Sequence, residues 1–417
     1  MNGNVVFDLT EMLLASTGKT RFYGIARTAA EIAAALARLD AKVRFCIYSA
    51  AHDRFFEVAV ERGSDGAVAF GIPYGVRQWR VRSVRAVRRP LRDTGSSVLR
   101  AIANARTRRA WSRAGIDLPK IDLTGTTFVT CSSPKVIVEE IATLRRLGAN
   151  LRMVPLLHDL IPFYDEFEPR KPTFPARFVS DNAVVIGNAE RILTNSAFTR
   201  DEVVRFAADG RLPPLPSGGV HAVPLVHECP LGDEAPAAPP PDVPFLLTVG
   251  AMLGRKNLEA SLDALAIMRA AGGPVPRLVI AGAHRQKTED HLNSDARAGI
   301  RDLVDMRTSP SQSDLVALYE KAIATVVGSR MEGWGLPAGE SLWLGTPAIC
   351  ADVPALREVA GDLGLFFDPD SPDQLARHVT RLMTDGAYAG ELRKRIAASR
   401  PRLRTWSDVA RDLLSAL

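Results

Sequence analysis

The chain has 417 residues, which is long enough for two domains, and 46% of its residues are hydrophobic and 24% charged. These values exclude a disordered, fibrous or disulfide-stapled protein. The net charge is +6 at pH 7, but the segment from Arg77 to Arg113 holds 12 arginines and one acid, Asp93. The positive charge is therefore local, and a local basic patch suits an anionic partner.

The cysteines and the N-terminus indicate a reducing compartment. The four cysteines lie far apart and form no Cys/His cluster, which argues against both a zinc site and a disulfide framework: Cys46, Cys131, Cys229 and Cys350. No basic segment opens the chain, and no window approaches about 20 uncharged apolar residues. We therefore expect a cytoplasmic protein without a signal peptide or a membrane span.

The first half of the chain alternates short apolar runs with a helical pattern. Strands are predicted at Val5–Leu9, Val43–Tyr48, Thr127–Cys131 and Met153–Leu157, and an Ala-rich helix at Ile25–Leu39. The proline-rich segment 228–244 then removes backbone donors and fixes φ, so neither helix nor strand is expected there. We interpret this segment as an interdomain linker.

The second half alternates strands and helices more regularly. Strands are predicted at Phe245–Gly250, Arg277–Gly282, Ala324–Gly328 and Ala348–Val353, and helices at Leu258–Ala271, Ser313–Lys321 and from about Pro337. This order indicates a parallel sheet covered by helices on both faces. The expected domains are 1–227 and 245–390, with a C-terminal helix at 391–417 that packs back toward the first domain.

Two loops combine glycines with charged residues where a strand gives way to a helix. Arg255 and Lys256 follow the strand that ends at Gly250, where free helix N–H groups and two cations suit an anion; a surface Arg-Lys pair is the alternative. Gly24 stands at the start of the first helix, where the backbone could approach a phosphate or simply turn.

The most informative loop is Glu332-Gly333-Trp334-Gly335-Leu336-Pro337-Ala338-Gly339-Glu340. Pro337 suits the first turn of a helix, and the glycines permit close approach of the backbone to a ligand. Carboxylates near a phosphate site are useful where they accept hydrogen bonds from sugar hydroxyls. Glu340 could instead be a first-turn acid that the helix dipole favours.

The spacing from Glu332 to Glu340 resembles the E-x7-E motif of retaining glycosyltransferases of family 4. The resemblance extends to further motifs in the same order: His158-Asp159-Leu160-Ile161-Pro162, Thr194-Asn195-Ser196-Ala197-Phe198-Thr199-Arg200, Gly254-Arg255-Lys256-Asn257, Leu344-Gly345-Thr346-Pro347-Ala348 and Leu356-Arg357-Glu358-Val359. It is strong over residues 245–385 and patchy before them. It implies a GT-B fold of two Rossmann-like doubly wound α/β domains, with the active site in the cleft between them.

The resemblance also implies roles for individual residues. Arg255 and Lys256 would bind the donor diphosphate, with the backbone of Gly335 and Leu336 and, in the first domain, Gly24. Glu340 would bind the ribose hydroxyls.

Two further residues are implied to be catalytic. Glu332 would contact the transferred sugar near its anomeric carbon, and His158 would reach that sugar from the first domain. This chain departs from the family's usual pattern near Gly24, where it has no Gly-Gly pair.

No metal cofactor is implied. GT-B enzymes usually stabilise the leaving diphosphate with cations and helix N-termini, and Asp368-Pro369-Asp370, although spaced like a metal-binding motif, is interpreted as a turn before a helix. The expected reaction is transfer of mannose from GDP-mannose to a growing polysaccharide or a lipid-linked glycan. A UDP- or dTDP-sugar is the alternative donor.

The basic segment predicts a second kind of partner. Within Arg77–Arg92, Val84, Val87 and Leu91 recur at helical spacing among arginines, with Trp79 at the edge. This pattern is typical of a basic amphipathic helix, which would hold the protein on the inner face of the cell membrane; an exposed Arg-rich helix is the alternative. A non-catalytic basic binding protein is the competing function, although nucleic acid is not expected because interleaved aromatics are missing.

Overall fold

The computed structural model describes residues 4–16, 24–40, 42–63, 67–80, 91–164, 173–232, 235–250 and 252–417. The chain divides into two compact units. Unit 1 comprises residues 1–223 and 406–417, and unit 2 comprises residues 224–405.

Unit 1 is built on a seven-stranded sheet with the strand order β3-β2-β1-β6-β7-β8-β9, in which only β3 is antiparallel to its neighbour. Its strands are β1 Val5–Asp8, β2 Arg44–Ser49, β3 Arg54–Val58, β6 Thr127–Thr130, β7 Arg152–Leu157, β8 Ile192–Thr194 and β9 Val220–Ala222, with β4 Val60–Arg62 and β5 Val68–Phe70 as a separate hairpin. Its helices are α1 Thr10–Ala15, α2 Ile25–Leu39, α3 Leu91–Arg113, α4 Pro134–Leu147, α5 Thr173–Ile186, α6 Ala197–Ala208 and α14 Trp406–Ser415, besides a 3-10 turn at Ile161–Phe163.

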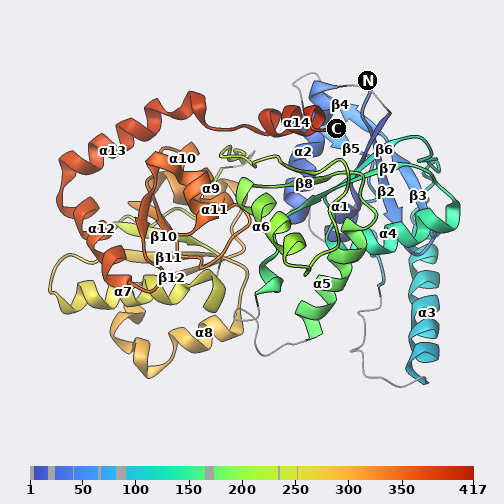
Figure 1. Cartoon of the computed structure of the whole chain (residues 1–417). Coiled ribbons are helices and arrows are strands. Elements are labelled where there is room, and N and C mark those ends of the chain that lie inside the picture. Colours follow the sequence, from blue (N-terminus) through green and yellow to red (C-terminus); the bar gives the residue numbers. More distant parts are fainter. Residues whose placement is uncertain are drawn as a thin grey trace. The chain divides into compact units, whose positions relative to one another are not determined.

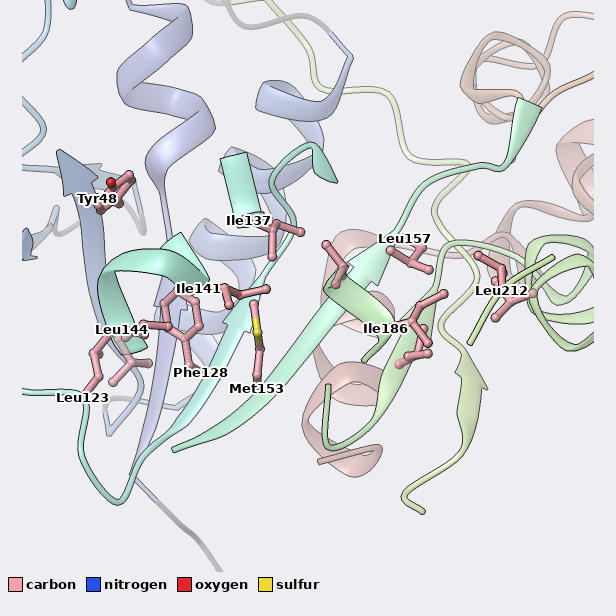
Figure 2. Close-up of a cluster of buried hydrophobic side chains, with 14 of the residues drawn as sticks. Tyr48, Leu123, Phe128, Ile137, Ile141, Leu144, Met153, Leu157, Ile186 and Leu212 are labelled. Carbon is pink, nitrogen blue, oxygen red and sulfur yellow. The ribbon is translucent and has the colours of Figure 1, made fainter. Parts of the chain in front are cut away.

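The core of unit 1 lies between this sheet and the helices that cover it (Figure 2). Phe128 of β6 and Met153 of β7 meet Ile137, Ile141 and Leu144 of α4. The helix begins at a proline and ends at Gly148 in the left-handed conformation, so its bounds follow from ordinary start and stop residues.

Unit 2 has a six-stranded, all-parallel sheet with the order β12-β11-β10-β13-β14-β15. Its strands are β10 Phe245–Val249, β11 Arg277–Gly282, β12 Val304–Thr308, β13 Ala324–Val327, β14 Ala348–Ala351 and β15 Leu365–Phe367. Its helices are α7 Leu258–Ala270, α8 Gln286–Leu292, α9 Gln312–Lys321, α10 Leu336–Trp343, α11 Pro354–Ala360, α12 Pro372–Thr384 and α13 Gly386–Ala398, besides 3-10 turns at Gly254–Lys256, Asp295–Leu303, Gly361–Leu363 and Arg400–Arg402.

The strand order of unit 2 is that of a Rossmann sheet, with the order reversing between β10 and β13. Figure 1 shows α7 and α8 on one side of this sheet and α9, α10 and α11 on the other. Ligands of such sheets bind outside the carboxyl ends of the strands at the reversal point. The loops after β10 and β13 are therefore the first place to look for a site.

Two segments differ from the sequence-based expectation. The proposed linker 228–244 is part of unit 2, where Gln312 of α9 donates a hydrogen bond to the Pro230 carbonyl (2.9 Å) and Asp314 accepts one from the Ala238 amide (3.0 Å). The expected C-terminal helix is interrupted between Ala398 and Trp406, and its last part, α14, packs on α2 in unit 1. Proline removes regular structure but does not prevent packing, which explains the first difference.

Candidate functional site

Three charged side chains meet at the switch point of unit 2. Arg255 and Lys256 lie in the 3-10 turn after β10, and Glu332 lies in the loop after β13. Lys256 Nζ donates to Glu332 Oε1 over 2.5 Å, and Arg255 Nη1 is 3.6 Å from Glu332 Oε2. Two cations share one carboxylate, so the cluster keeps one net positive charge for an incoming anion.

Backbone contacts hold the two loops of this cluster together. Arg255 Nη1 donates to the Met331 carbonyl (2.9 Å), and the Arg330 amide donates to the Arg255 carbonyl (2.8 Å). Asn257, whose φ of 51° is left-handed, donates from Nδ2 to the Pro369 carbonyl (2.9 Å) in the turn after β15. The Arg255 guanidinium is thus held by a main-chain carbonyl, and the Lys256 ammonium by Glu332.

Glu332 is ionised in this setting. Burial raises the pKa of its carboxyl, but Lys256 and Arg255, together with a hydrogen bond from Ser329, outweigh burial and hold the pKa below its ordinary value. The side chain of Glu332 is 10% exposed, whereas both cations are 24% exposed. The two cations are therefore more accessible than the carboxylate between them.

Glu340 has different surroundings. It lies on α10, is 2% exposed, and accepts a hydrogen bond from the Tyr319 hydroxyl of α9 (2.9 Å) at Oε2. Tyr319 is itself fully buried. Sequence reasoning missed Tyr319, and no signal in the sequence connects it with Glu340, because the contact arises only when α9 and α10 pack.

The start of α10 depends on Gly335. This residue has a φ of 105°, and a Cβ added there would lie 2.4 Å from Leu356 Cδ2 of α11. Leu336 is the first helical residue; Pro337, which follows it, has no N–H, and the Ala338 amide donates to the Gly335 carbonyl (2.9 Å). The left-handed φ thus requires glycine at this position, and a Cβ would in addition force the Leu356 side chain to move.

Gly335→Ala should therefore destabilise unit 2 by about 2–4 kcal/mol, since left-handed strain and a steric clash add. Gly345→Ala is the matched control, because Gly345 also has positive φ (80°) but open space around its Cβ. The control should cost about 1 kcal/mol. Thermal unfolding of both variants checks this, and equal losses would show that the contact with Leu356 is unimportant.

Trp334, in the same loop, makes contacts that stabilise unit 2. Its indole Nε1 donates to the Val226 carbonyl (3.0 Å), and its ring meets that of His227 edge-on at 6.1 Å. His227 Nε2 donates to the Val359 carbonyl (2.8 Å), while its Nδ1 accepts from the Arg404 amide (3.1 Å). This pattern ties the chain just after the boundary between the units to the site's own loop.

The remaining predicted residues lie in unit 1. His158 follows β7, and its Nε2 donates to the Cys131 carbonyl (2.8 Å), so Nδ1 is the acceptor nitrogen of the neutral ring. Burial lowers the pKa of His158, although the Cys131 carbonyl and the nearby Asp159 and Glu11 act in the opposite direction. The imidazole is therefore neutral at pH 7.

Gly24 caps the N-terminus of α2 with a φ of 57° and with open space where a Cβ would stand. The structure thus brings Arg255, Lys256 and Glu332 together and places Gly335, Leu336 and Glu340 at the start of α10 or on it. It places His158 and Gly24 separately, in unit 1.

Among the described residues, no group of three or more His, Cys, Asp or Glu side chains is arranged to hold a metal ion. Asp368, Pro369 and Asp370 form a turn, with the Asp370 amide donating to Asp368 Oδ1 (2.9 Å).

The chain is similar to known proteins both in its fold and in the unit that contains the charged cluster. Residues 233–401 match the family described as "Glycosyl transferases group 1". Residues 233–401 are therefore similar to a group 1 glycosyltransferase domain. The matched segment contains the switch point of unit 2 and every predicted residue of that unit.

This chain is similar to two curated relatives and to one solved structure. It is 26% identical over 251 residues to the O-antigen chain mannosyltransferase B of Escherichia coli, covering 57% of this chain and 62% of the relative. It is 36% identical over 115 residues to the GDP-mannose:cellobiosyl-diphosphopolyprenol alpha-mannosyltransferase of Xanthomonas oryzae pv. oryzae, covering 27% and 30%. The aligned part thus spans less than two thirds of either relative.

The similarity to a solved structure extends over the whole chain. Anabaena HepE, determined in complex with UDP and glucose, superimposes with a TM-score of 0.64 over 100% of both chains at 13% identity. At this identity the likeness shows the fold, which is GT-B, and confirms the predicted fold class of two Rossmann-like α/β units.

Proposed function

We propose that the protein is a retaining, family 4-like glycosyltransferase that moves mannose from GDP-mannose to a growing polysaccharide or a lipid-linked glycan. The observation that carries the proposal is the cluster of Arg255, Lys256 and Glu332 at the switch point of a group 1 domain. The two mannosyltransferase relatives, one named for GDP-mannose, support the choice of donor.

The charges of the cluster suit the leaving group of this reaction. As the glycosidic bond to the nucleoside diphosphate breaks, negative charge develops on the phosphate oxygens. Lys256, Arg255 and the Leu336 amide at the start of α10 stabilise this charge without a metal ion. We therefore expect turnover to persist in the presence of a chelator.

The carboxylates serve the sugars. Glu332, ionised and reachable, stabilises the oxocarbenium-like centre that forms as the diphosphate leaves. Glu340, which Tyr319 holds in place, accepts hydrogen bonds from the ribose hydroxyls. From unit 1, we propose that His158 contacts the transferred sugar and that the open backbone at Gly24 approaches the donor phosphate.

A panel of nucleotide sugars tests the donor. GDP-mannose should raise the melting temperature more than UDP-glucose or dTDP-rhamnose at equal concentration, because a ligand that binds only the folded state stabilises it. A larger shift with UDP-glucose would favour the alternative donor, which the HepE complex with UDP and glucose makes the nearest competitor. Absence of any shift would favour a non-catalytic basic binding protein.

We further propose that an anionic membrane surface is a partner of unit 1. The amphipathic helix expected at Arg77–Arg92 falls mainly on residues 81–90, which lie outside the described part of the chain. The structure instead shows α3, and Figure 1 shows one half of it standing away from the sheet and the other helices of its unit.

The exposed side chains of α3 are apolar near its middle and basic toward its C-terminus. Val98, Leu99 and Ile102 are 58%, 50% and 45% exposed, and Arg106 and Arg109, one to two turns further on, are also exposed. The stretch 97–113 contains five arginines and no acid. An apolar patch followed by guanidinium groups on one helix face matches the acyl and headgroup layers of an anionic bilayer.

The opposite face anchors α3 to unit 1. Trp111 is 3% exposed and lies against the rings of His52 and Phe56 at 4.6 and 5.4 Å between centroids. The Trp79 amide donates to Thr107 Oγ1 over 2.9 Å. In the described ranges, no helix has the length and apolar character of a membrane-spanning segment, so contact with a bilayer through α3 would be peripheral.

Sedimentation with vesicles that contain about 30% phosphatidylglycerol tests this partner. The wild type should sediment, and both Ile102→Glu and the pair Arg106→Glu with Arg109→Glu should reduce binding about tenfold or more, since each arginine contributes about 1 kcal/mol and its reversal costs further. Lys287→Glu, on the exposed face of α8 in unit 2, is the control. No sedimentation of the wild type, or sedimentation unchanged by Ile102→Glu, would exclude the surface.

A further inference from the structure

A glutamate is fully buried in α4 of unit 1. Val136, Ile137, Ile141 and Leu144 form the inward face of this helix, and Glu140 lies on the same face with 0% exposure. A buried carboxylate is costly unless it is paired or hydrogen-bonded. Neither oxygen of Glu140 meets a hydrogen-bond donor in the part of the chain that the structure describes.

A second buried acid, Asp8 at the carboxyl end of β1, interacts with Glu140. Asp8 is 1% exposed and accepts hydrogen bonds at Oδ1 from the Thr10 amide (2.9 Å) and at Oδ2 from Thr130 Oγ1 (2.9 Å) and Ser132 Oγ (2.8 Å). These donors come from the ends of β1 and β6, between which the strand order of unit 1 reverses.

The contact between the two carboxyls requires a proton. The side chains of Asp8 and Glu140 interact with each other, and the groups that act most strongly on Glu140 after burial are the acids Asp8, Glu11 and Glu139. Burial, followed by these like charges, raises the pKa of Glu140 well above its ordinary value. Burial also raises the pKa of Asp8, but its hydrogen bonds counteract this, so Glu140 is the acid that keeps the proton.

Two further titratable neighbours of Glu140 are neutral. The Cys46 thiol and the Tyr48 hydroxyl, both on β2, interact electrostatically with Glu140, and burial raises the pKa of each, that of Tyr48 to about 12. Neither supplies a positive charge. On the side of α4, the protonated carboxyl of Glu140 is thus the hydrogen-bond donor to Asp8.

Asp8 in turn fixes the residues around His158. Thr130 and Ser132, which both donate to Asp8 Oδ2, flank Cys131, and the Cys131 carbonyl accepts the hydrogen bond from His158 Nε2. The orientation of that carbonyl decides which imidazole nitrogen carries the proton. We propose that Asp8 and Glu140 form a proton-sharing pair that positions His158 through the turn at residues 130–132. The inference rests on the proposed function only for the role of His158.

The shared proton is tested by the pH dependence of stability. A carboxyl whose pKa is raised on folding binds its proton more tightly in the folded state, so its contribution to stability falls as pH rises above about 4.5. Glu140→Gln replaces the acid O–H with an amide N–H donor and does not titrate. Between about pH 6 and pH 9 the melting temperature of the wild type should fall relative to this variant, by about 3 °C or more per pH unit.

Glu139→Gln is the matched control, since Glu139 neighbours Glu140 on α4 but is half-buried and paired with Arg80. Its melting temperature should still fall with pH as that of the wild type does, although slightly less, because one like charge near Glu140 is lost. If the melting temperature of Glu140→Gln changes with pH in the same way as that of the wild type, Glu140 carries no proton in the folded state and the pair does not exist.

The positioning role is tested on His158 itself. Nitrogen-15 spectra of the imidazole, assigned with a His158→Gln variant, should show a single Nε2–H tautomer in the wild type and a mixture in Asp8→Asn. Ser132→Ala, which removes one flanking hydroxyl, is the milder variant in case Asp8→Asn fails to fold. An unchanged tautomer in both would overturn the proposal.

Turnover distinguishes this proposal from the proposed function. If the enzyme turns over, Ser132→Ala should lower kcat about 3- to 10-fold while GDP-mannose binding, which is assigned to unit 2, stays unchanged. If the wild type turns over no donor, the proposed function fails, but the tautomer and the pH dependence still decide the pair.

Discussion

Replacing Lys256 with methionine is expected to weaken binding of GDP-mannose about 10- to 100-fold. The substitution keeps the aliphatic stem and removes one charge-assisted contact to the diphosphate, which is worth about 1.5–3 kcal/mol. Of its two cations Glu332 then retains Arg255, at 3.6 Å, so the cluster loses its net positive charge. Titration calorimetry with GDP-mannose measures the effect.

Lys287→Met is the control for this variant, because Lys287 is an exposed lysine on α8 of the same unit. Its affinity for the donor should equal that of the wild type. Equal affinities of Lys256→Met and the wild type would instead show that the diphosphate binds elsewhere, and would remove the observation on which the proposed function rests.

Glu332→Gln is expected to separate binding from chemistry. The variant removes the negative charge that neutralises Arg255 and Lys256, so binding of GDP should be retained or tightened. Transfer should fall about 100- to 1000-fold, since the carboxylate that faces the oxocarbenium-like centre is lost. Rapid-mixing or steady-state turnover, measured beside GDP affinity, tests this split.

Two results would contradict this account of Glu332. Glu320→Gln, an exposed substitution on α9, sets the reference value for both measurements. A Glu332→Gln variant that turns over as fast as Glu320→Gln would assign the carboxylate a structural role. Weakened GDP binding in Glu332→Gln would show that the carboxylate orients the two cations rather than competing with the phosphates for them.

Much of the fold could be predicted because the strands are buried on both faces and end at turn residues. The helix at Ile25–Leu39 and the strand at Arg277–Gly282 have the predicted bounds. The strand Val304–Thr308 was missed: it lies at the edge of its sheet, and its sequence, VDMRT, lacks the apolar run on which the other predictions depended.

The site could be predicted only in part. Strand ends located Arg255, Lys256 and Glu332 in loops, and the parallel sheet brings such loops to one edge, but the bond between Lys256 and Glu332, which are 76 residues apart in sequence, follows only from the order of β10 and β13. The interaction of Glu340 with Tyr319 depends in the same way on helix packing.

The burial of Glu140 could have been predicted from the sequence. It follows Val136 by four residues and precedes Leu144 by four, so helical periodicity places it on the apolar face of α4. An acid on the buried face of an amphipathic helix is unusual and indicates a partner. The identity of that partner, Asp8, was not predictable, because it lies more than 130 residues away and reaches α4 only through the sheet.

The central claim is that the charged cluster of unit 2 supports cleavage of a nucleotide sugar. The most direct measurement is the release of GDP from GDP-mannose, followed with and without bacterial lipid extract as a source of acceptor, for the wild type and for Lys256→Met. We predict GDP release by the wild type, faster with acceptor, and little or none by the variant. Binding of the donors in the panel without release of a nucleoside diphosphate from any of them, under either condition, would contradict the account.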